Sequence, residues 1–200
     1  MILCNLKNLL TEKGTNISRV ARDTGISRTT LTSLYNNACQ GVQLDTVNTL
    51  CKYLNIGIEN LFLFSKYDIR IRMPDFRYFP GDELPNELEG SCYFTIDTGK
   101  RKKEYEMYCV QHLYFEHYEI YHIDVELSFF DEAIDRSGEK LDQDIVEENR
   151  MMKRVFSELS PAYKQWIREK IEMNIEGMYY PSKCLAEECD IVVNYPQELK

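Results

Sequence analysis

The spacing of apolar residues changes twice along the chain. From Leu3 to about Phe64 they recur every three or four positions in short blocks, the period of amphipathic helices. After Ser65 they alternate with polar residues, which is the period of half-buried strands. Helical spacing returns near Leu141 and continues to about Gly177. We therefore predict an all-α domain followed by an α+β domain with a mainly antiparallel sheet and two C-terminal helices.

The first stretch predicts five short helices. Their apolar blocks are Leu3–Leu10, Ile17–Ala21, Leu31–Leu34, Leu44–Leu54 and Ile58–Phe62. Gly14 and Gly25 suit helix ends, Asn16 and Ser27 suit helix starts, and Gly57 is expected to close the fourth helix. The domain boundary is placed after residue 65, which gives domains of residues 1–65 and 66–200.

The second domain is expected to contain several long strands and two helices. The expected strands are 67–73, 92–96, 105–115 and 121–129, with an edge strand at 190–195. Pro74–Gly90 is predicted to be a loop because it holds three prolines and two glycines. Helices are expected along 145–159 and 161–178, since Pro161 suits the first turn of a helix.

Composition favours a folded cytoplasmic protein. Hydrophobic residues make up 44% of the chain, which is enough for a core, and no apolar run approaches the roughly 18 residues that span a membrane. The seven cysteines include no C-x-x-C pair, so we expect reduced and mostly buried thiols. Cys184 and Cys189 are the only local candidates for redox or metal chemistry.

Charge separates the two domains. Residues 1–65 contain six Lys or Arg and four Asp or Glu, which gives a net charge of +2. Residues 66–200 contain 18 Lys or Arg and 29 Asp or Glu, which gives a net charge of −11. Together the two domains account for the net charge of −9 of the chain. Such an asymmetry indicates that the two domains have separate tasks.

The segment Asn16–Tyr35 resembles the helix-turn-helix of the Xre/Cro-type regulators. The matching residues are Ala21, Gly25, Ile26, Ser27, Leu31 and Leu34. The following Leu44–Phe62 is similar to the last two helices of that family, so the resemblance extends over about 65 residues. Small residues at positions 21 and 25 let two helices cross closely, and the second can then enter a DNA major groove about 12 Å wide.

The resemblance implies double-stranded DNA as the partner and assigns DNA contacts to particular residues. Base reading is assigned to Arg28, Thr29, Thr32 and Ser33. Phosphate contacts are assigned to Asn16, Ser18, Arg19, Asn36 and Asn37. Two features depart from the family: Ile17 replaces a common glutamine, and the loop 38–43 has no Lys or Arg, which weakens attraction to phosphates. A helix-turn-helix that has lost DNA binding and serves in dimerisation or docking is the alternative.

Residues 66–200 resemble no family that we recognise. They show no nucleophile with a nearby base, no glycine-rich phosphate loop and no cofactor signature. We therefore expect no enzyme activity, no cofactor and no metal. His112, His117 and His122 would need a turn between strands and added carboxylates to form a metal site. The Lys100–Lys103 cluster either contacts DNA or is a solvated turn. The 14 tyrosines of the chain, many of them between residues 67 and 121, fit a recognition surface or a tyrosine-rich core.

These features predict a sequence-specific transcriptional regulator. We expect a phage-type or bacterial repressor that binds a two-fold symmetric operator as a homodimer. The alternative is an inhibitor or adaptor, for example a phage anti-defence protein. In that case residues 66–200 capture a host protein, and the N-terminal domain only controls expression of its own gene.

Overall fold

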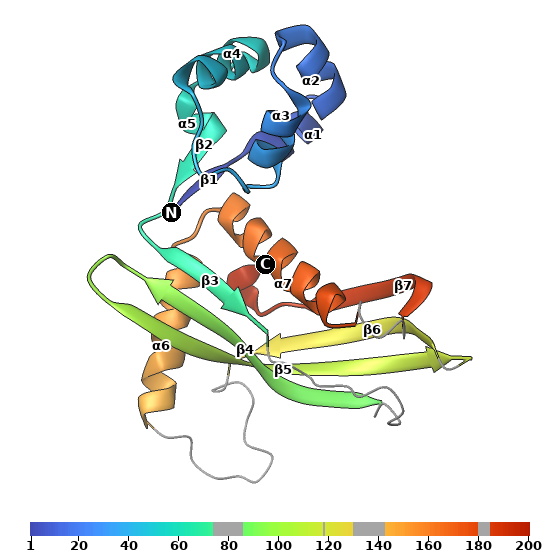
Figure 1. Ribbon diagram of the computed structural model, residues 1–200. Helices are drawn as coiled ribbons and strands as arrows, with labels where there is room; N and C mark the ends of the chain where they lie inside the picture. The colour runs from blue at the N-terminus through green and yellow to red at the C-terminus, as the bar shows by residue number, and fades with distance from the viewer. Residues whose placement is uncertain (74–85, 118, 130–142, 180–184) are drawn as a thin grey trace. The chain divides into compact units, whose positions relative to one another are not determined.

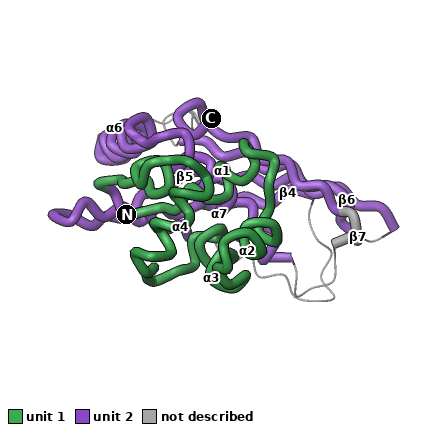
Figure 2. The backbone as a smooth tube through the Cα atoms, turned by 90° about the horizontal axis from the view of Figure 1, so that it is seen from above, with its two compact units in different colours: residues 1–66 green, residues 67–200 purple. Residues whose placement is uncertain are grey.

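The computed structural model describes residues 1–73, 86–117, 119–129, 143–179 and 185–200. The chain divides into two compact units, Met1–Lys66 and Tyr67–Lys200, which Figure 2 shows in different colours. Each unit has its own secondary structure and its own core.

The first unit is helical with one small sheet (Figure 1). Its helices are α1 (Leu6–Glu12), α2 (Ile17–Thr24), α3 (Arg28–Tyr35), α4 (Leu44–Leu54) and α5 (Ile58–Leu61). The prediction of an all-α domain with five helices needs correction, because α5 is a single turn of four residues. In addition, β1 (Ile2–Cys4) and β2 (Phe62–Phe64) pair antiparallel. Leu3 and Phe62, which were expected in helices, therefore lie opposite backbone partners in a sheet.

The predicted caps of α2 and α3 are present. The Asn16 side chain accepts a hydrogen bond from the Arg19 backbone N–H at 3.0 Å, and Ser27 accepts one from Thr30 at 3.1 Å. Such side-chain oxygens satisfy free amides of the first helical turn. Gly57 does not close α4: the helix ends at Asn55 in a left-handed conformation, and Gly57 precedes α5 instead.

The second unit contains a five-stranded sheet in the order β3-β4-β5-β6-β7. Its strands are β3 (Asp68–Arg72), β4 (Glu87–Asp97), β5 (Lys102–Glu116), β6 (Glu119–Ser128) and β7 (Leu185–Asn194). The first four strands pair antiparallel, but β7 runs parallel to β6, so the sheet is mixed. Much of the predicted loop 74–90 lies outside the described residues, and its last part is wrong because β4 begins at Glu87.

Two helices cover one face of this sheet (Figure 1). They are α6 (Gln143–Ser157) and α7 (Pro161–Tyr179), as predicted. The Phe156 ring of α6 packs edge-on against Phe94 of β4, with centroids 5.2 Å apart. The Tyr179 hydroxyl of α7 donates to the Gln111 side chain of β5 at 2.6 Å. None of the described helices has the length and apolarity needed to cross a membrane.

The opposite face of the sheet, which we call the outer face, carries mainly polar side chains. Strand register places on it Asp68, Glu87, Glu89, Asp97, Glu104, Glu106, Asp124, Glu126 and Asp190. The bases on the same face are Arg70, Arg72 and Lys102, and the tyrosines are Tyr93, Tyr108 and Tyr114. On the described strands, the outer face therefore carries more acidic than basic side chains.

Candidate nucleic-acid interface

Helices α2 and α3 are joined by a tight turn at Gly25. Its φ of 75° is left-handed, a conformation that glycine adopts without a steric penalty. The Gly25 N–H closes the end of α2 on the Ala21 carbonyl at 2.9 Å, and the Ile26 N–H donates to the Thr24 hydroxyl at 3.2 Å. These bonds fix the direction in which the chain enters α3.

Two leucines hold α3 against the rest of the unit. Leu31 and Leu34 are fully buried in a cluster that includes Val20 of α2 and Leu50 of α4. The opposite side of α3 is polar: Arg28, Thr29 and Thr32 are exposed, and Ser33 is half-buried. The structure thus places three of the four predicted base-reading side chains in solvent on one short helix.

Arg28 links the two helices of the motif. Its guanidinium donates a hydrogen bond to the Ser18 hydroxyl near the start of α2, although ten positions separate the two residues. Both side chains are exposed. A predicted base-reading residue and a predicted phosphate contact are therefore adjacent in space, as a continuous DNA-binding surface requires.

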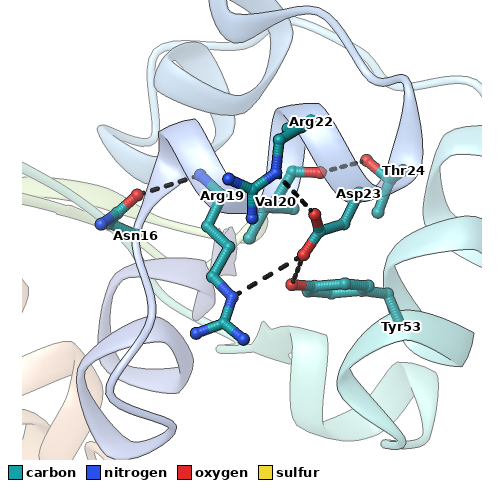
Figure 3. Close-up of polar contacts among 7 residues, drawn as sticks. All are labelled: Asn16, Arg19, Val20, Arg22, Asp23, Thr24 and Tyr53. Carbon is teal, nitrogen blue, oxygen red and sulfur yellow. Dashed lines mark hydrogen bonds and ion pairs between the residues drawn. The ribbon is translucent and has the colours of Figure 1, made fainter.

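A carboxylate sits among the arginines of α2 (Figure 3). Asp23 lies 3.0 Å from the Arg22 guanidinium and 3.8 Å from that of Arg19, and it accepts a hydrogen bond from the Tyr53 hydroxyl of α4 at 2.9 Å. The Tyr53 hydrogen bond, followed by the Arg22 hydrogen bond, lowers the pKa of Asp23 below its ordinary value of 3.8. Asp23 therefore remains charged at neutral pH and offers Arg19 a fixed partner on α2.

We expect Tyr53→Phe to raise the pKa of Asp23 toward its ordinary value, because the largest cause of the shift is removed. A carbon-detected NMR titration of the carboxyl group measures this directly. The interactions of charged Asp23 are lost as the pH falls through its lowered pKa, so the variant should lose them at a higher pH. Tyr35→Phe is the control, and an unchanged Asp23 titration in Tyr53→Phe would contradict this assignment.

The two asparagines after α3 are placed differently. Asn36 is exposed at the end of the helix. The Asn37 side chain, which is half-buried, accepts from the Cys4 N–H at 2.6 Å and donates to the Cys4 carbonyl at 3.1 Å. Asn37 thus ties the end of α3 to β1. A phosphate contact for Asn37 stays a prediction, but the structure shows this additional role.

Sequence reasoning missed Arg22, Asp23 and Tyr53. The i, i+4 spacing of Arg19 and Asp23 is a signal for a helical ion pair and was available in the sequence. Tyr53 could not have been found in this way, because it is 30 positions away from Asp23 and belongs to another helix.

Two of the three histidines of the second unit lie next to carboxylates on the outer face. His112 lies 3.2 Å from Glu87, and His122 lies 3.2 Å from Asp124 and 3.4 Å from Asp190. Within the described part of the chain, no group of three or more His, Cys, Asp or Glu side chains is arranged to hold a metal ion. Cys184, one of the two cysteines considered for metal or redox chemistry, lies outside the described residues.

The Lys100–Lys103 cluster and the buried thiols of the second unit are placed differently. Lys103 bonds to Glu148 of α6, whereas Lys100, Arg101 and Lys102 are exposed at the β4–β5 hairpin tip. Burial raises the pKa of the Cys109 thiol to about 12. This thiol is therefore protonated at neutral pH and behaves as a small apolar side chain.

Comparison with known proteins assigns the first unit to a family. Residues 5–66 match the family model of the Cro/C1-type HTH DNA-binding domain. A search of the curated proteins and a search of the solved structures each found no significant match. The resemblance predicted from Asn16–Tyr35 and Leu44–Phe62 is thereby confirmed for the N-terminal part of the chain.

Proposed function

We propose that this DNA-binding regulator, whose residues 5–66 form a Cro/C1-type helix-turn-helix domain, acts as a dimeric repressor on a two-fold symmetric operator. One observation carries the proposal: α3 presents Arg28, Thr29 and Thr32 to solvent while Leu31 and Leu34 anchor it in the core. A short helix with this arrangement can lie in the major groove with its N-terminal residues at the base edges.

The chemistry of these side chains supports base reading. Arginine can donate two hydrogen bonds to O6 and N7 of guanine, and threonine methyl groups suit the thymine methyl. Arg28 stands at the first position of α3, and the N-terminal residues of a recognition helix contact the base edges. Asn16, Ser18 and Arg19 at the start of α2 are then available for the neighbouring phosphates.

Dimerism follows from the size of the reading surface. One short helix contacts too few base pairs for useful specificity, so regulators of this kind pair two helices on adjacent half-sites. A dimer that covers a promoter excludes the polymerase, and this output requires neither catalysis nor a cofactor. We expect a phage-like arrangement in which the protein represses its own gene.

We expect Arg28→Ala to weaken specific operator binding by about 1–3 kcal/mol, because a bidentate contact to one base pair is lost. Gel-shift titrations at a stated salt concentration, on operator and on random DNA, measure the effect. Arg22→Ala is the matched control, since it removes an exposed arginine from the neighbouring helix. An equal loss on random DNA would show that Arg28 contacts only phosphate.

A second candidate function is favoured by the outer face of the sheet. Its acidic side chains and its tyrosines Tyr93, Tyr108 and Tyr114 suit the capture of a basic protein surface. In this case residues 67–200 inhibit a host protein, as a phage anti-defence protein would, and the helix-turn-helix only regulates expression. Residues 67–200 expressed alone separate the two functions: an inhibitor keeps its effect and retains a stable partner in a pull-down, whereas a repressor loses its effect.

A further inference from the structure

The two edges of the five-stranded sheet differ in chemistry. At one edge, β3 carries Asp68, Arg70 and Arg72, all exposed. At the other edge, the end of β7 reads Ile191-Val192-Val193-Asn194 and holds no charged residue. Edge strands present unpaired backbone N–H and C=O groups that pair with other strands unless charged side chains or prolines prevent it. Of the two edges, β3 is protected in this way and the end of β7 is not.

Side-chain exposure supports the same distinction. Val192 faces the outer side of the sheet and is 40% exposed. Ile191 and Val193 point to the face that the helices cover, yet both are only half-buried. Their neighbours on β6, Ile123 and Val125, are fully buried. The apolar surface of the sheet thus continues to this edge and is open there.

We propose that β7 pairs antiparallel with β7 of a second copy of this chain, about a two-fold axis at Val192. The two five-stranded sheets would then join into one continuous sheet with the helices of both copies on the same face. This inference rests on the proposed dimeric function and assigns the dimer contact to particular residues.

The sequence of β7 selects this register. An axis perpendicular to the sheet places residues of the same face opposite each other. With the axis at Val192, Ile191 lies opposite Val193 of the partner copy, and Asp190 lies opposite Asn194. An axis at Asp190 would put two carboxylates together, which is unfavourable. An axis at Ile191 would place Asp190 opposite the apolar Val192. Of these three registers, only the one with its axis at Val192 places apolar residues opposite apolar residues and Asp190 opposite the amide of Asn194.

Self-complementarity favours a second copy over another protein. In a two-fold interface the same surface serves both partners, so every favourable pair away from the axis occurs twice. The acid nearest the axis, Asp190, lies opposite the uncharged Asn194 of the partner copy, so this register brings no two carboxylates together. Residues 190–194 therefore have the pattern of apolar and polar positions that their own antiparallel copy requires.

Substitution of Val192 provides the first test of the β7–β7 contact. Val192→Lys should raise the dissociation constant of the full-length dimer at least about tenfold, because it places two ammonium groups opposite each other at the axis. Val192→Thr, which keeps the β-branched shape without charge, should remain dimeric. Sedimentation velocity over a micromolar concentration series measures both. A Val192→Lys protein as dimeric as the wild type would overturn the proposal.

Cysteine cross-linking tests the register without disturbing the pairing. Directly opposed residues in an antiparallel pair have Cα atoms about 4.5–5.5 Å apart, within the range that a disulfide bridges. Val192→Cys should therefore form a covalent dimer under mild oxidation. Asn194→Cys, on the same strand and face, should not, because the two copies of residue 194 are separated by four positions, roughly 14 Å. Wild-type protein shows the background from the native cysteines, and cross-linking of both variants or of neither would contradict the register.

The outcomes separate this inference from the proposed function. A wild-type protein that binds its operator as a dimer, with Val192→Lys still dimeric, leaves the function standing and overturns the β7 contact. A wild-type protein that cross-links through Val192→Cys but binds no specific DNA supports the contact and rejects the repressor function.

Discussion

Removal of residues 67–200 should lower operator affinity by about 100-fold or more. In a dimer, binding of one helix-turn-helix holds the second near its half-site at a high effective concentration, which raises affinity by about 10²–10⁴. The first unit has its own core, built from residues such as Leu10, Leu31 and Leu50, so residues 1–66 should stay folded. We expect this fragment to sediment as a monomer and the full chain as a dimer. Gel-shift titration of both on the same operator measures the loss.

A fusion provides the control for this experiment. Joining residues 1–66 to a short dimeric coiled coil should restore most of the lost affinity if dimerisation is what the second unit supplies. A fragment 1–66 that is dimeric by itself, or a monomeric full-length protein at micromolar concentration, would contradict the division of labour between the two units.

Replacement of Phe156 by alanine should destabilise the second unit by about 3–5 kcal/mol, the usual cost of removing a buried phenylalanine side chain. Phe156 of α6 is fully buried, and its ring packs against Phe94 and Phe129 at centroid distances of 5.2 and 6.2 Å. The variant leaves a cavity between the helix and the sheet. Because a domain of this size is stable by about 5–15 kcal/mol, the loss is a large fraction of the total.

Urea denaturation followed by tryptophan fluorescence measures this effect in the second unit alone. The chain has one tryptophan, Trp166, and it lies in α7 of that unit. Tyr121→Ala is the control, since Tyr121 is 44% exposed and its removal leaves no internal cavity. Equal shifts of the denaturation midpoint in the two variants would show that Phe156 is not a core residue.

The local signals of the first unit were sufficient to place its main helices. Asn16, Ser27 and Gly25 act at the ends of α2 and α3 through bonds that involve only neighbouring residues, so the sequence alone reveals them. The pairing of Ile2 with Phe64 joins the two ends of the unit. Such a contact forms only when the whole unit folds, which is why Leu3 and Phe62 were assigned to helices.

The alternating strands of the second unit were predictable for a similar reason, but their partners were not. A period of two residues shows that one face of a strand is buried, and it carries no information on the direction of the neighbouring strand. The parallel pairing of β7 with β6 was therefore not predicted. Glu87–Gly90 was assigned to a loop together with the proline- and glycine-containing residues before it, although β5 pairs with Glu87–Gly90 throughout.

The candidate site was predictable where one helix determines it. Exposed Arg28, Thr29 and Thr32 follow from the burial of Leu31 and Leu34 on a single helix. The contacts from Arg28 to Ser18 and from Tyr53 to Asp23 join different helices. They depend on how these helices pack, and helical spacing alone does not determine that packing.

Footprinting of the full-length protein on the DNA upstream of its own gene tests the central claim most directly. At about 0.1 M salt, with competing random DNA to suppress electrostatic binding, we expect two protected half-sites related by a two-fold axis. Their centres should lie about 10 base pairs apart, or a multiple of that distance, because the two reading helices enter the same side of the duplex. Protection that disappears with competitor, or a single unsymmetric patch, would contradict a dimeric sequence-specific repressor.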